Sequence, residues 1–295
     1  MILSAINARK REKAMRNTPL LDYPTKHPII LCHGLFGFDT VSNIIHYWTE
    51  IPSALKAAGC EVWAARVPAT SSVETRAKAL VRQITEKYRG RSVHLVGHSM
   101  GGLDCRYLTT HLLDGAGFKV LSVTTIATPH WGTPTVDLLA ETHVVETPLI
   151  RFLLNMVPFG DGDGKAIVSL STNACIEFNK NTPDVPGVRY FSYGCKFSPG
   201  PVDALTWGLS HLYLHLKHGE NDGAVSVRSA QWGEYLGTIE NVTHTEIIGH
   251  KFTQFTRLGD VLNRLGGQAP FDPNQFMVKH ARKLATEVET TVAGV

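Results

Sequence analysis

The pentapeptide Gly97-His-Ser-Met-Gly101 has the residue types and spacing of a nucleophile on a sharp turn. The apolar run 93–96 before it has the length of a buried strand, and residues 103–113 after it have helical spacing. A strand that turns at once into a helix crowds the backbone around the central residue, and glycine at 97 and 101 removes the two Cβ atoms that would collide. The pattern therefore predicts that Ser99 is an exposed catalytic nucleophile above a helix N-terminus.

A serine hydroxyl is a poor nucleophile at neutral pH, so it needs a base, and the base needs a third group that orients it. Where a strand, a nucleophile and a helix follow one another in this way, the acid and then the histidine come later in the chain. Asp222, in the turn Asn221-Asp-Gly223, is the predicted acid. Glu220 is a near alternative, and Asp203 is a more distant one.

The predicted base is His244, because it directly follows an expected strand at 238–242. His250 is the alternative base. His33 and His98 adjoin motif glycines, and we expect both to be structural. The side chain of His98 should point away from the nucleophile, because the two residues are neighbours in sequence.

Acyl transfer also needs donors for the oxyanion of the tetrahedral intermediate. The residue after the nucleophile, Met100, is expected to supply one backbone N–H. The loop His33-Gly-Leu35 follows the first apolar run and places the N–H of Leu35 as the second donor.

The remaining pattern alternates apolar runs of strand length with helical segments, which is typical of a parallel, doubly wound α/β sheet. We predict strands at 28–32, 61–67, 92–96, 120–127, 188–193 and 238–242, and helices at 47–59, 73–89, 103–113 and 205–217. The histidines of the last helix, His211, His215 and His218, lie on a different face from its leucines. We interpret that face as solvated rather than metal-binding, because no further ligand is obvious.

Between Pro148 and Pro158 lies a short helix that is apolar nearly all round, followed by a glycine-rich segment at 159–164. Such an insertion after a sheet strand predicts a lid that covers an apolar site in water and opens at a lipid surface. Candidate residues for the acyl site and the lid are Phe36, Trp131, Leu149, Phe152, Leu153 and Met156.

Length and composition are those of a globular protein with one large α/β domain or two small ones. The chain has 295 residues, of which 43% are hydrophobic, and its net charge of +3 does not favour a nucleic-acid partner. We predict a basic tail at 1–22 and a single domain at 23–295, with a lid insertion at about 135–180 and a helical extension at about 266–295.

No apolar run is long enough to span a membrane, and the first residues lack the apolar core of a secretory signal. We therefore expect an intracellular location, cytoplasmic or mitochondrial. The five cysteines are widely spaced and favour reduced thiols, although a pair between Cys175 and Cys195 remains open.

Four motifs in order, Gly97-His-Ser-Met-Gly-Gly102, His33-Gly-Leu-Phe-Gly37, Thr128-Pro-His-Trp-Gly132 and Asn221-Asp-Gly223, resemble the triacylglycerol lipases of the α/β-hydrolase superfamily. The resemblance spans residues 28–262 and is strongest to the Pseudomonas and Burkholderia type and its fungal relatives, some of them mitochondrial. It implies an α/β-hydrolase fold, a triad of Ser99, Asp222 and His244, oxyanion donors at Leu35 and Met100, and a mobile lid at 140–165.

The chain also departs from that family pattern. The bacterial enzymes are secreted with a disulfide, have glutamine where this chain has Met100, and hold a structural calcium through an aspartate where this chain has Glu246. A second calcium carboxylate would have to come from Asp203. No cofactor is therefore expected, and calcium stays a weak alternative.

The sequence thus predicts a serine carboxylester hydrolase, a triacylglycerol lipase that acts on acylglycerols and contacts a lipid surface transiently through its lid. A soluble esterase, thioesterase or acyltransferase with the same triad is the alternative enzyme. A hydrolase-fold module that binds lipid or protein without catalysis is the alternative of a different class.

Overall fold

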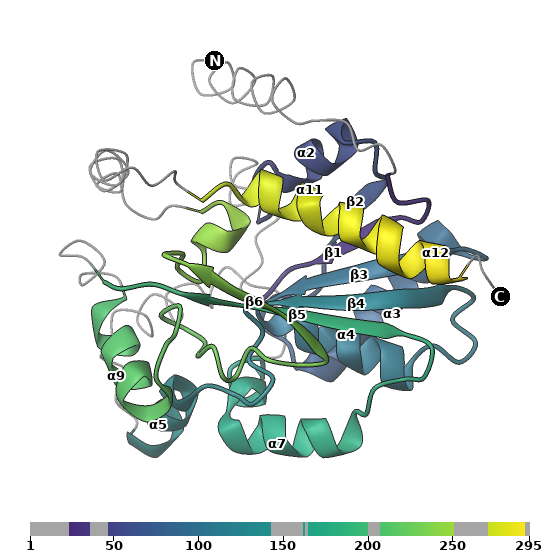
Figure 1. Cartoon of the computed structure of the whole chain (residues 1–295). Coiled ribbons are helices and arrows are strands. Elements are labelled where there is room, and N and C mark those ends of the chain that lie inside the picture. The colour runs from purple at the N-terminus through teal and green to yellow at the C-terminus, as the bar shows by residue number, and fades with distance from the viewer. Residues whose placement is uncertain are drawn as a thin grey trace, which may run out of the picture.

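A six-stranded, all-parallel sheet forms the centre of the computed structural model (Figure 1). The structure describes residues 24–35, 47–142, 162, 165–199, 207–250 and 271–292. The strand order is β2-β1-β3-β4-β5-β6. The α/β fold class expected from the sequence is confirmed by this sheet.

All six strands lie within or beside the segments expected from the sequence. They are β1 (Ile29–Cys32), β2 (Val62–Ala65), β3 (Ser92–His98), β4 (Lys119–Ile126), β5 (Arg189–Lys196) and β6 (Glu234–Glu240). The chain order reverses between β1 and β3, and ligands of open α/β sheets bind at the carboxyl ends of strands at such a switch point. Ser99 directly follows β3 and therefore lies there.

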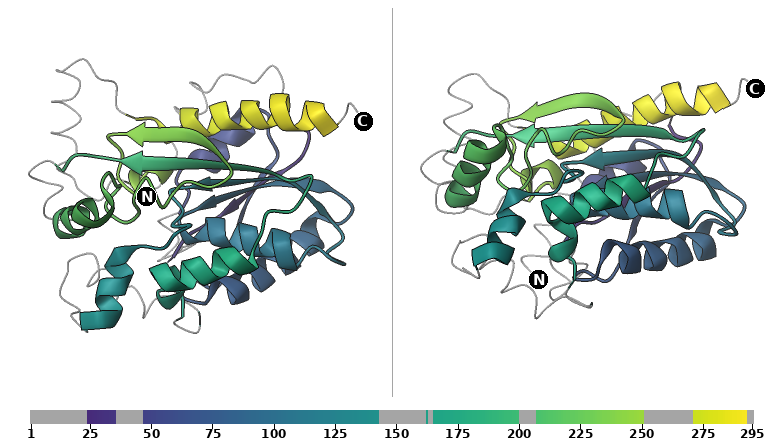
Figure 2. Two further views of the ribbon diagram at one scale, coloured as in Figure 1. Left: turned by 60° about the horizontal axis from the view of Figure 1, so that its bottom comes forward. Right: turned by 90° about the horizontal axis from the view of Figure 1, so that it is seen from below.

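Helices cover both faces of this sheet (Figures 1 and 2). One face carries α3 (Val73–Tyr88) and α4 (Met100–His111), and the other carries α2 (Ile51–Ala57) and α11 (Pro273–Lys283). Strand β1 explains how both layers are held: Ile29 and Leu31 pack into the core beneath α2, whereas Ile30 and Cys32 pack into the core beneath α3.

Further helices occupy the segment predicted to contain the lid and the predicted C-terminal extension. They are α5 (Pro134–Thr142), a 3₁₀ turn at Val168–Leu170, α7 (Thr172–Asn181), a π-helical turn at Leu284–Val288, and α12 (Glu289–Val292). A second 3₁₀ turn, Glu246–Ile248, follows the predicted base. The apolar helix expected at 149–157 lies outside the described residues.

The C-terminal helices are tied into the sheet by buried polar contacts. His280 bonds through Nε2 to Thr124 Oγ1 at 2.8 Å and through Nδ1 to Tyr193 Oη at 3.2 Å. Glu289 bonds to His94 Nε2 at 3.1 Å, and His94 lies on β3, the strand that carries the nucleophile. Residues 273–292 therefore form part of the core layer above the sheet.

Glu289 also accepts hydrogen bonds from the main-chain N–H groups of Lys26 (2.8 Å) and His27 (3.0 Å). Partial burial raises the pKa of this carboxyl group, but the hydrogen bonds from His94 and from the two N–H groups outweigh burial, so its pKa is lowered. One carboxylate thus joins the start of the described chain, the central strand and the last helix.

Helix α9 (Gly208–His218) is oriented differently from the sequence expectation. Its leucine face is exposed, with Leu209, Leu212 and Leu216 retaining 58%, 54% and 75% of their accessible surface. His211, expected on a solvated face, is half-buried against Phe197 and bonds to its carbonyl oxygen at 3.0 Å. The expected solvated face is found at His215, which is exposed, but not at His211, because Phe197 packs against that ring.

All five cysteines are buried and free, so Cys175 and Cys195, which the sequence left as an open pair, are not bridged. Within the described ranges, no helix is both long and apolar enough to cross a membrane.

Replacing Glu289 by glutamine should destabilise the fold by about 1–3 kcal/mol, because three buried or half-buried donors lose their charged acceptor. The contribution of the carboxylate is complete above its unfolded-state pKa, near 4.5, and is lost as the pH falls through the lower folded-state pKa. Urea unfolding at neutral pH and near pH 4 measures both effects. Glu86→Gln, at an exposed site on α3, is the control; equal midpoints for the two variants would contradict this role.

Candidate active site

Ser99 lies between β3 and α4 with a left-handed backbone, φ 55° and ψ −131°. A Cβ on Gly97 would come within 2.5 Å of the main chain of Gly101 and Gly102, and a Cβ on Gly101 would collide with the carbonyl oxygens of Cys32 and His33. Glycine is therefore required at both positions, as the sequence pattern predicted. The turn is held by hydrogen bonds from Ser99 N to the Ile126 carbonyl (2.9 Å) and from Thr128 Oγ1 to the Ser99 carbonyl (2.8 Å).

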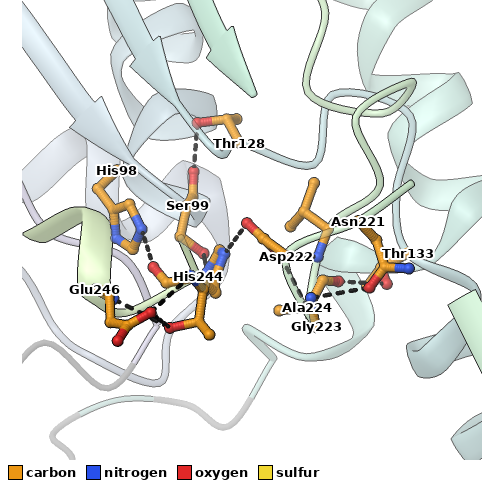
Figure 3. A network of polar contacts seen from close by, with 12 residues as sticks. His98, Ser99, Thr128, Thr133, Asn221, Asp222, Gly223, Ala224, His244 and Glu246 are labelled. Carbon is orange, nitrogen blue, oxygen red and sulfur yellow. Dashed lines mark hydrogen bonds and ion pairs between the residues drawn. The ribbon is translucent and has the colours of Figure 1, made fainter. Parts of the chain in front are cut away.

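Three residues from distant parts of the chain meet at this turn (Figure 3). His244 Nε2 lies 2.9 Å from Ser99 Oγ, and His244 Nδ1 lies 2.8 Å from Asp222 Oδ2. Because the carboxylate can only accept, Nδ1 carries the hydrogen, and in the neutral ring Nε2 is left to accept from the serine hydroxyl. This arrangement can remove the proton from Ser99 and hold the resulting imidazolium beside a negative charge.

The turn that contains Asp222 fixes its carboxylate. Oδ1 accepts from the main-chain N–H groups of Ala224 (2.9 Å) and Val225 (2.7 Å), which leaves Oδ2 for the imidazole. The side chain is fully buried. The N–H of His244 also donates to the Asp222 carbonyl oxygen at 2.9 Å, so the acid and the base are joined through both main chain and side chain.

The alternative acids and bases are engaged elsewhere or lie outside the described part of the chain. Glu220 pairs with Lys196 at 2.7 Å, and His250 Nε2 bonds to the Tyr47 carbonyl oxygen at 2.8 Å. Asp203 lies outside the described residues. Of the candidates that the structure describes, the contact network around Ser99 contains Asp222 and His244.

The loop after β1 is held against Ser99 by a buried arginine. Arg76 Nη2 donates to the carbonyl oxygens of His33 (2.6 Å) and Gly34 (3.2 Å), and its Nε pairs with Asp104 at 2.8 Å. Burial raises the pKa of Asp104 to about 7, although the charge of Arg76 and its hydrogen bond to Asp104 act to lower it. Arg76 and Asp104 are fully buried.

The orientation of the peptide between Gly34 and Leu35 follows from these contacts. The Gly34 carbonyl oxygen accepts from Arg76 and from His33 Nδ1 (2.9 Å). In a trans peptide the N–H points opposite to the carbonyl, so the N–H of Leu35 is directed away from Arg76. A Cβ on Gly34 would come within 2.7 Å of Ser99 Cβ, which shows how closely this loop approaches the nucleophile. The side chains of Leu35 and Met100 belong to one apolar cluster.

His33 is structural, as expected. Its Nε2 accepts from the N–H of Val67 at 3.0 Å while Nδ1 donates to Gly34. Burial, followed by the charge of Arg76, lowers the pKa of His33 to about 3, so it stays neutral at the site.

Sequence reasoning did not find Arg76, Asp104 or Thr128 as parts of the site. One signal was present for Arg76: it falls in the apolar stripe of the 73–89 helix, between Val73 and Ala77, where a charged side chain must find a buried partner. The side chain of His98 was expected to point away from the nucleophile, but its ring packs against the ring of His244 at a centroid distance of 4.7 Å.

Most of the predicted acyl-site and lid residues lie outside the described part of the chain, namely Phe36, Leu149, Phe152, Leu153 and Met156. Trp131 is described; it is 43% exposed, and its ring centroid lies 6.0 Å from that of Trp232.

Glu246, one of the two weak calcium candidates, has partners within its own turn. Its Oε2 accepts hydrogen bonds from the N–H (3.0 Å) and the hydroxyl (2.9 Å) of Thr243 (Figure 3). The carboxylate therefore stabilises the turn that contains His244. Among the described residues, no cluster of three or more histidine, cysteine, aspartate or glutamate side chains could hold a metal. Asp203, the other calcium candidate, lies outside the described residues.

Comparisons with known proteins agree with this geometry. A family model described as the alpha/beta hydrolase fold matches residues 27–142. The Saccharomyces cerevisiae protein named Triacylglycerol lipase 2 is 32% identical over 274 residues, covering 77% of this chain and 82% of the yeast protein. The chain belongs to the α/β-hydrolase triacylglycerol lipase family. Among other relatives, the Burkholderia plantarii triacylglycerol lipase is 36% identical over 287 residues, covering 76% of this lipase-family chain and 79% of its own.

Solved lipase structures share the fold of this family member. A Bacillus licheniformis lipase in mature form superposes with a TM-score of 0.62 at 23% identity, covering 83% of this chain and 96% of its own. A Staphylococcus hyicus lipase gives a TM-score of 0.61 at 21% identity, covering 84% and 98% of the two chains.

Replacing Arg76 and Asp104 together, as Arg76→Met with Asp104→Leu, leaves no buried charge without its partner, but the carbonyl oxygens of His33 and Gly34 lose their donor. The lipase-family protein should stay folded, with a free energy of unfolding lowered by about 1–3 kcal/mol. With the Gly34 carbonyl no longer held, kcat for a soluble ester should fall by about 10- to 100-fold at unchanged KM, less than the full loss of an oxyanion donor. Arg91→Met breaks an exposed pair with Glu61 and serves as control. Unchanged kcat in the folded double variant would show that the arginine does not orient this peptide.

Proposed function

We propose that this protein is a triacylglycerol lipase that hydrolyses fatty-acyl esters through an acyl-enzyme on Ser99. The observation that carries the proposal is the continuous contact from Asp222 through His244 to the Ser99 hydroxyl, at 2.8 and 2.9 Å. The lipase family membership supports an ester of a long acyl chain as the substrate class.

In the first half of the proposed reaction, Ser99 Oγ attacks the ester carbonyl carbon while His244 Nε2 takes the hydroxyl proton. The negative charge that develops on the carbonyl oxygen is stabilised by the backbone N–H groups of Leu35 and Met100. His244 then gives its proton to the departing alcohol, and the acyl group remains on Ser99.

In the second half, water attacks the acyl-enzyme and His244 takes one of its protons. Collapse of the intermediate releases the fatty acid and returns the proton to Ser99. Every proton passes through one imidazole, and Asp222 holds it in the required tautomer. The proposed chemistry is complete with these side chains and needs no cofactor, since Glu246 is already used within its own turn.

Ser99→Ala should abolish hydrolysis of both a soluble short-chain ester and an emulsified triacylglycerol, because no other group supplies the nucleophile; the expected loss in kcat is at least about 10³-fold. Wild-type enzyme should be labelled by a fluorophosphonate, and a chelator should leave its activity unchanged. Retained turnover in the folded variant would exclude the acyl-enzyme, and loss of activity in chelator would exclude the metal-free reaction.

We also propose that the edge of the molecule at which the site opens meets a lipid surface. Helix α9 lies beyond the carboxyl ends of β5 and β6 (Figure 2), and the loop that follows it leads to Asp222. Its exposed leucines are accompanied by Tyr213 and Lys217, a combination typical of helices that lie in a lipid interface. The lid predicted within 135–180 would share this contact.

Replacing Leu209, Leu212 and Leu216 by serine should lower both binding to triacylglycerol emulsions and their hydrolysis, by about 10-fold or more, because the apolar area that favours adsorption is removed. Hydrolysis of a soluble ester should stay unchanged. Glu74→Ser with Lys78→Ser changes two exposed side chains on α3, outside both α9 and the predicted lid, and is the control. Equal losses on both substrates would argue for a folding defect instead of lost adsorption.

The protein is proposed to work inside the cell, in the cytoplasm or mitochondria. The five free, buried cysteines support this location, since cysteines in oxidising compartments are commonly paired. Fractionation of cells that express the tagged full chain should recover it with cytosolic or mitochondrial markers, and accumulation in the medium would contradict the proposal.

A further inference from the structure

The side chain of His98, the residue before the nucleophile, contacts the main chain of the base, His244. His98 Nε2 lies 2.9 Å from the His244 carbonyl oxygen, and His98 Nδ1 lies 2.6 Å from Tyr47 Oη. Tyr47 Oη in turn accepts from the N–H of Gly34 at 2.8 Å. A single row of contacts therefore runs from the loop after β1 to the turn that carries His244.

With a neutral His98 ring, only one arrangement of hydrogens satisfies all three contacts. The His244 carbonyl can only accept, so His98 Nε2 carries a hydrogen. The Gly34 N–H can only donate, so Tyr47 Oη accepts it and offers its own hydrogen to His98 Nδ1. In this row of hydrogen bonds, Gly34 N–H donates to Tyr47, Tyr47 O–H donates to His98, and His98 N–H donates to His244. Every donor points the same way.

This arrangement requires a neutral His98 and a protonated Tyr47. Burial, followed by the charge of neighbouring His244, lowers the pKa of His98 well below its ordinary value. Burial also raises the pKa of the Tyr47 hydroxyl. A second positive charge beside His244 would oppose the imidazolium that forms during proton transfer, and a neutral ring avoids it.

The row joins two loops that the sheet does not connect. Gly34 follows β1 and precedes Leu35, whereas His244 follows β6, and β3, β4 and β5 lie between these strands. The distance between the oxyanion donor and the base must nevertheless be constant, because both act on the same tetrahedral carbon. Tyr47 and His98 bridge this gap beside the nucleophile.

Building on the serine hydrolase function proposed above, we propose that Tyr47 and His98 are positioning residues that hold the oxyanion loop and the base in register with each other. The hydrogen bonds of both residues go to the loop, to each other and to the His244 main chain, and the His98 ring also packs against the His244 ring. Their effect is exerted through Gly34 on one side and through the His244 main chain on the other.

The test compares variants that cut the row at different points. Tyr47→Phe removes the first two contacts, and His98→Ala removes the last two. His98→Gln keeps an N–H that can reach the His244 carbonyl, whereas His98→Asn keeps an acceptor for Tyr47. All variants are assayed on a soluble short-chain ester, with urea midpoints recorded for each, and Tyr88→Phe and His111→Gln are matched controls on α3 and α4.

The expected result is a fall in kcat of about 10- to 100-fold for Tyr47→Phe and for His98→Ala, with KM changed by less than about twofold. The double variant, Tyr47→Phe with His98→Ala, should have the same kcat as His98→Ala alone, because both changes break the same row of hydrogen bonds. His98→Gln should recover part of the rate. Additive losses in the double variant, a change confined to KM, or activity equal to wild type in the folded variants would overturn the proposal.

A second readout does not depend on turnover. In ¹⁵N-histidine spectra, His98 should appear as the neutral tautomer protonated at Nε2 and should not titrate between about pH 5 and 8. Titration in that range, or the opposite tautomer, would overturn the row. If the wild-type enzyme hydrolyses no ester, the proposed function is wrong. If the wild-type enzyme is active and the Tyr47 and His98 variants have the same kcat, only the positioning role of these two residues is wrong.

Discussion

The left-handed backbone at Ser99 is the constraint on which the rest of this molecule depends. Such a conformation costs about 1–3 kcal/mol in a residue with a side chain, and it persists only where the surroundings impose it. Here they include glycine at 97 and 101, the carbonyl of Ile126 and the hydroxyl of Thr128. The strain lifts the hydroxyl out of the strand and toward the imidazole of His244.

Around that turn, each functional group is held by more than one hydrogen bond. The Asp222 carboxylate is fixed by two N–H groups of its own turn, and His244 is joined to it through both main chain and side chain. The Gly34 peptide is held by Arg76 and His33 at its carbonyl, and the Gly34 N–H is held by Tyr47. Buried histidines recur in this scaffold as neutral donors and acceptors, which explains how a core can contain His33, His98 and His280 without added charge.

The sheet and the turn at Ser99 were predictable because both arise from local sequence. Apolar runs of strand length and paired glycines are visible without any partner, and the order of serine, acid and histidine restricts where the other groups can lie. The pairing of Arg76 with Asp104 and that of His98 with His244 were not predictable, because the two residues of each pair are more than 25 positions apart in the chain. The exposure of the α9 leucines was not predictable for a related reason. A leucine stripe predicts an apolar neighbour, but it does not indicate whether that neighbour is the core or something outside the chain.

A crystal structure of the enzyme with a phosphonate bound covalently to Ser99 would test the central arrangement most directly, since the phosphonyl oxygen occupies the place of the oxyanion. The account predicts that this oxygen lies about 2.7–3.1 Å from the N–H nitrogens of both Leu35 and Met100. It also predicts that His244 remains between the bound group and Asp222. A phosphonyl oxygen that faces solvent or other donors, or an imidazole turned away from Asp222, would contradict it.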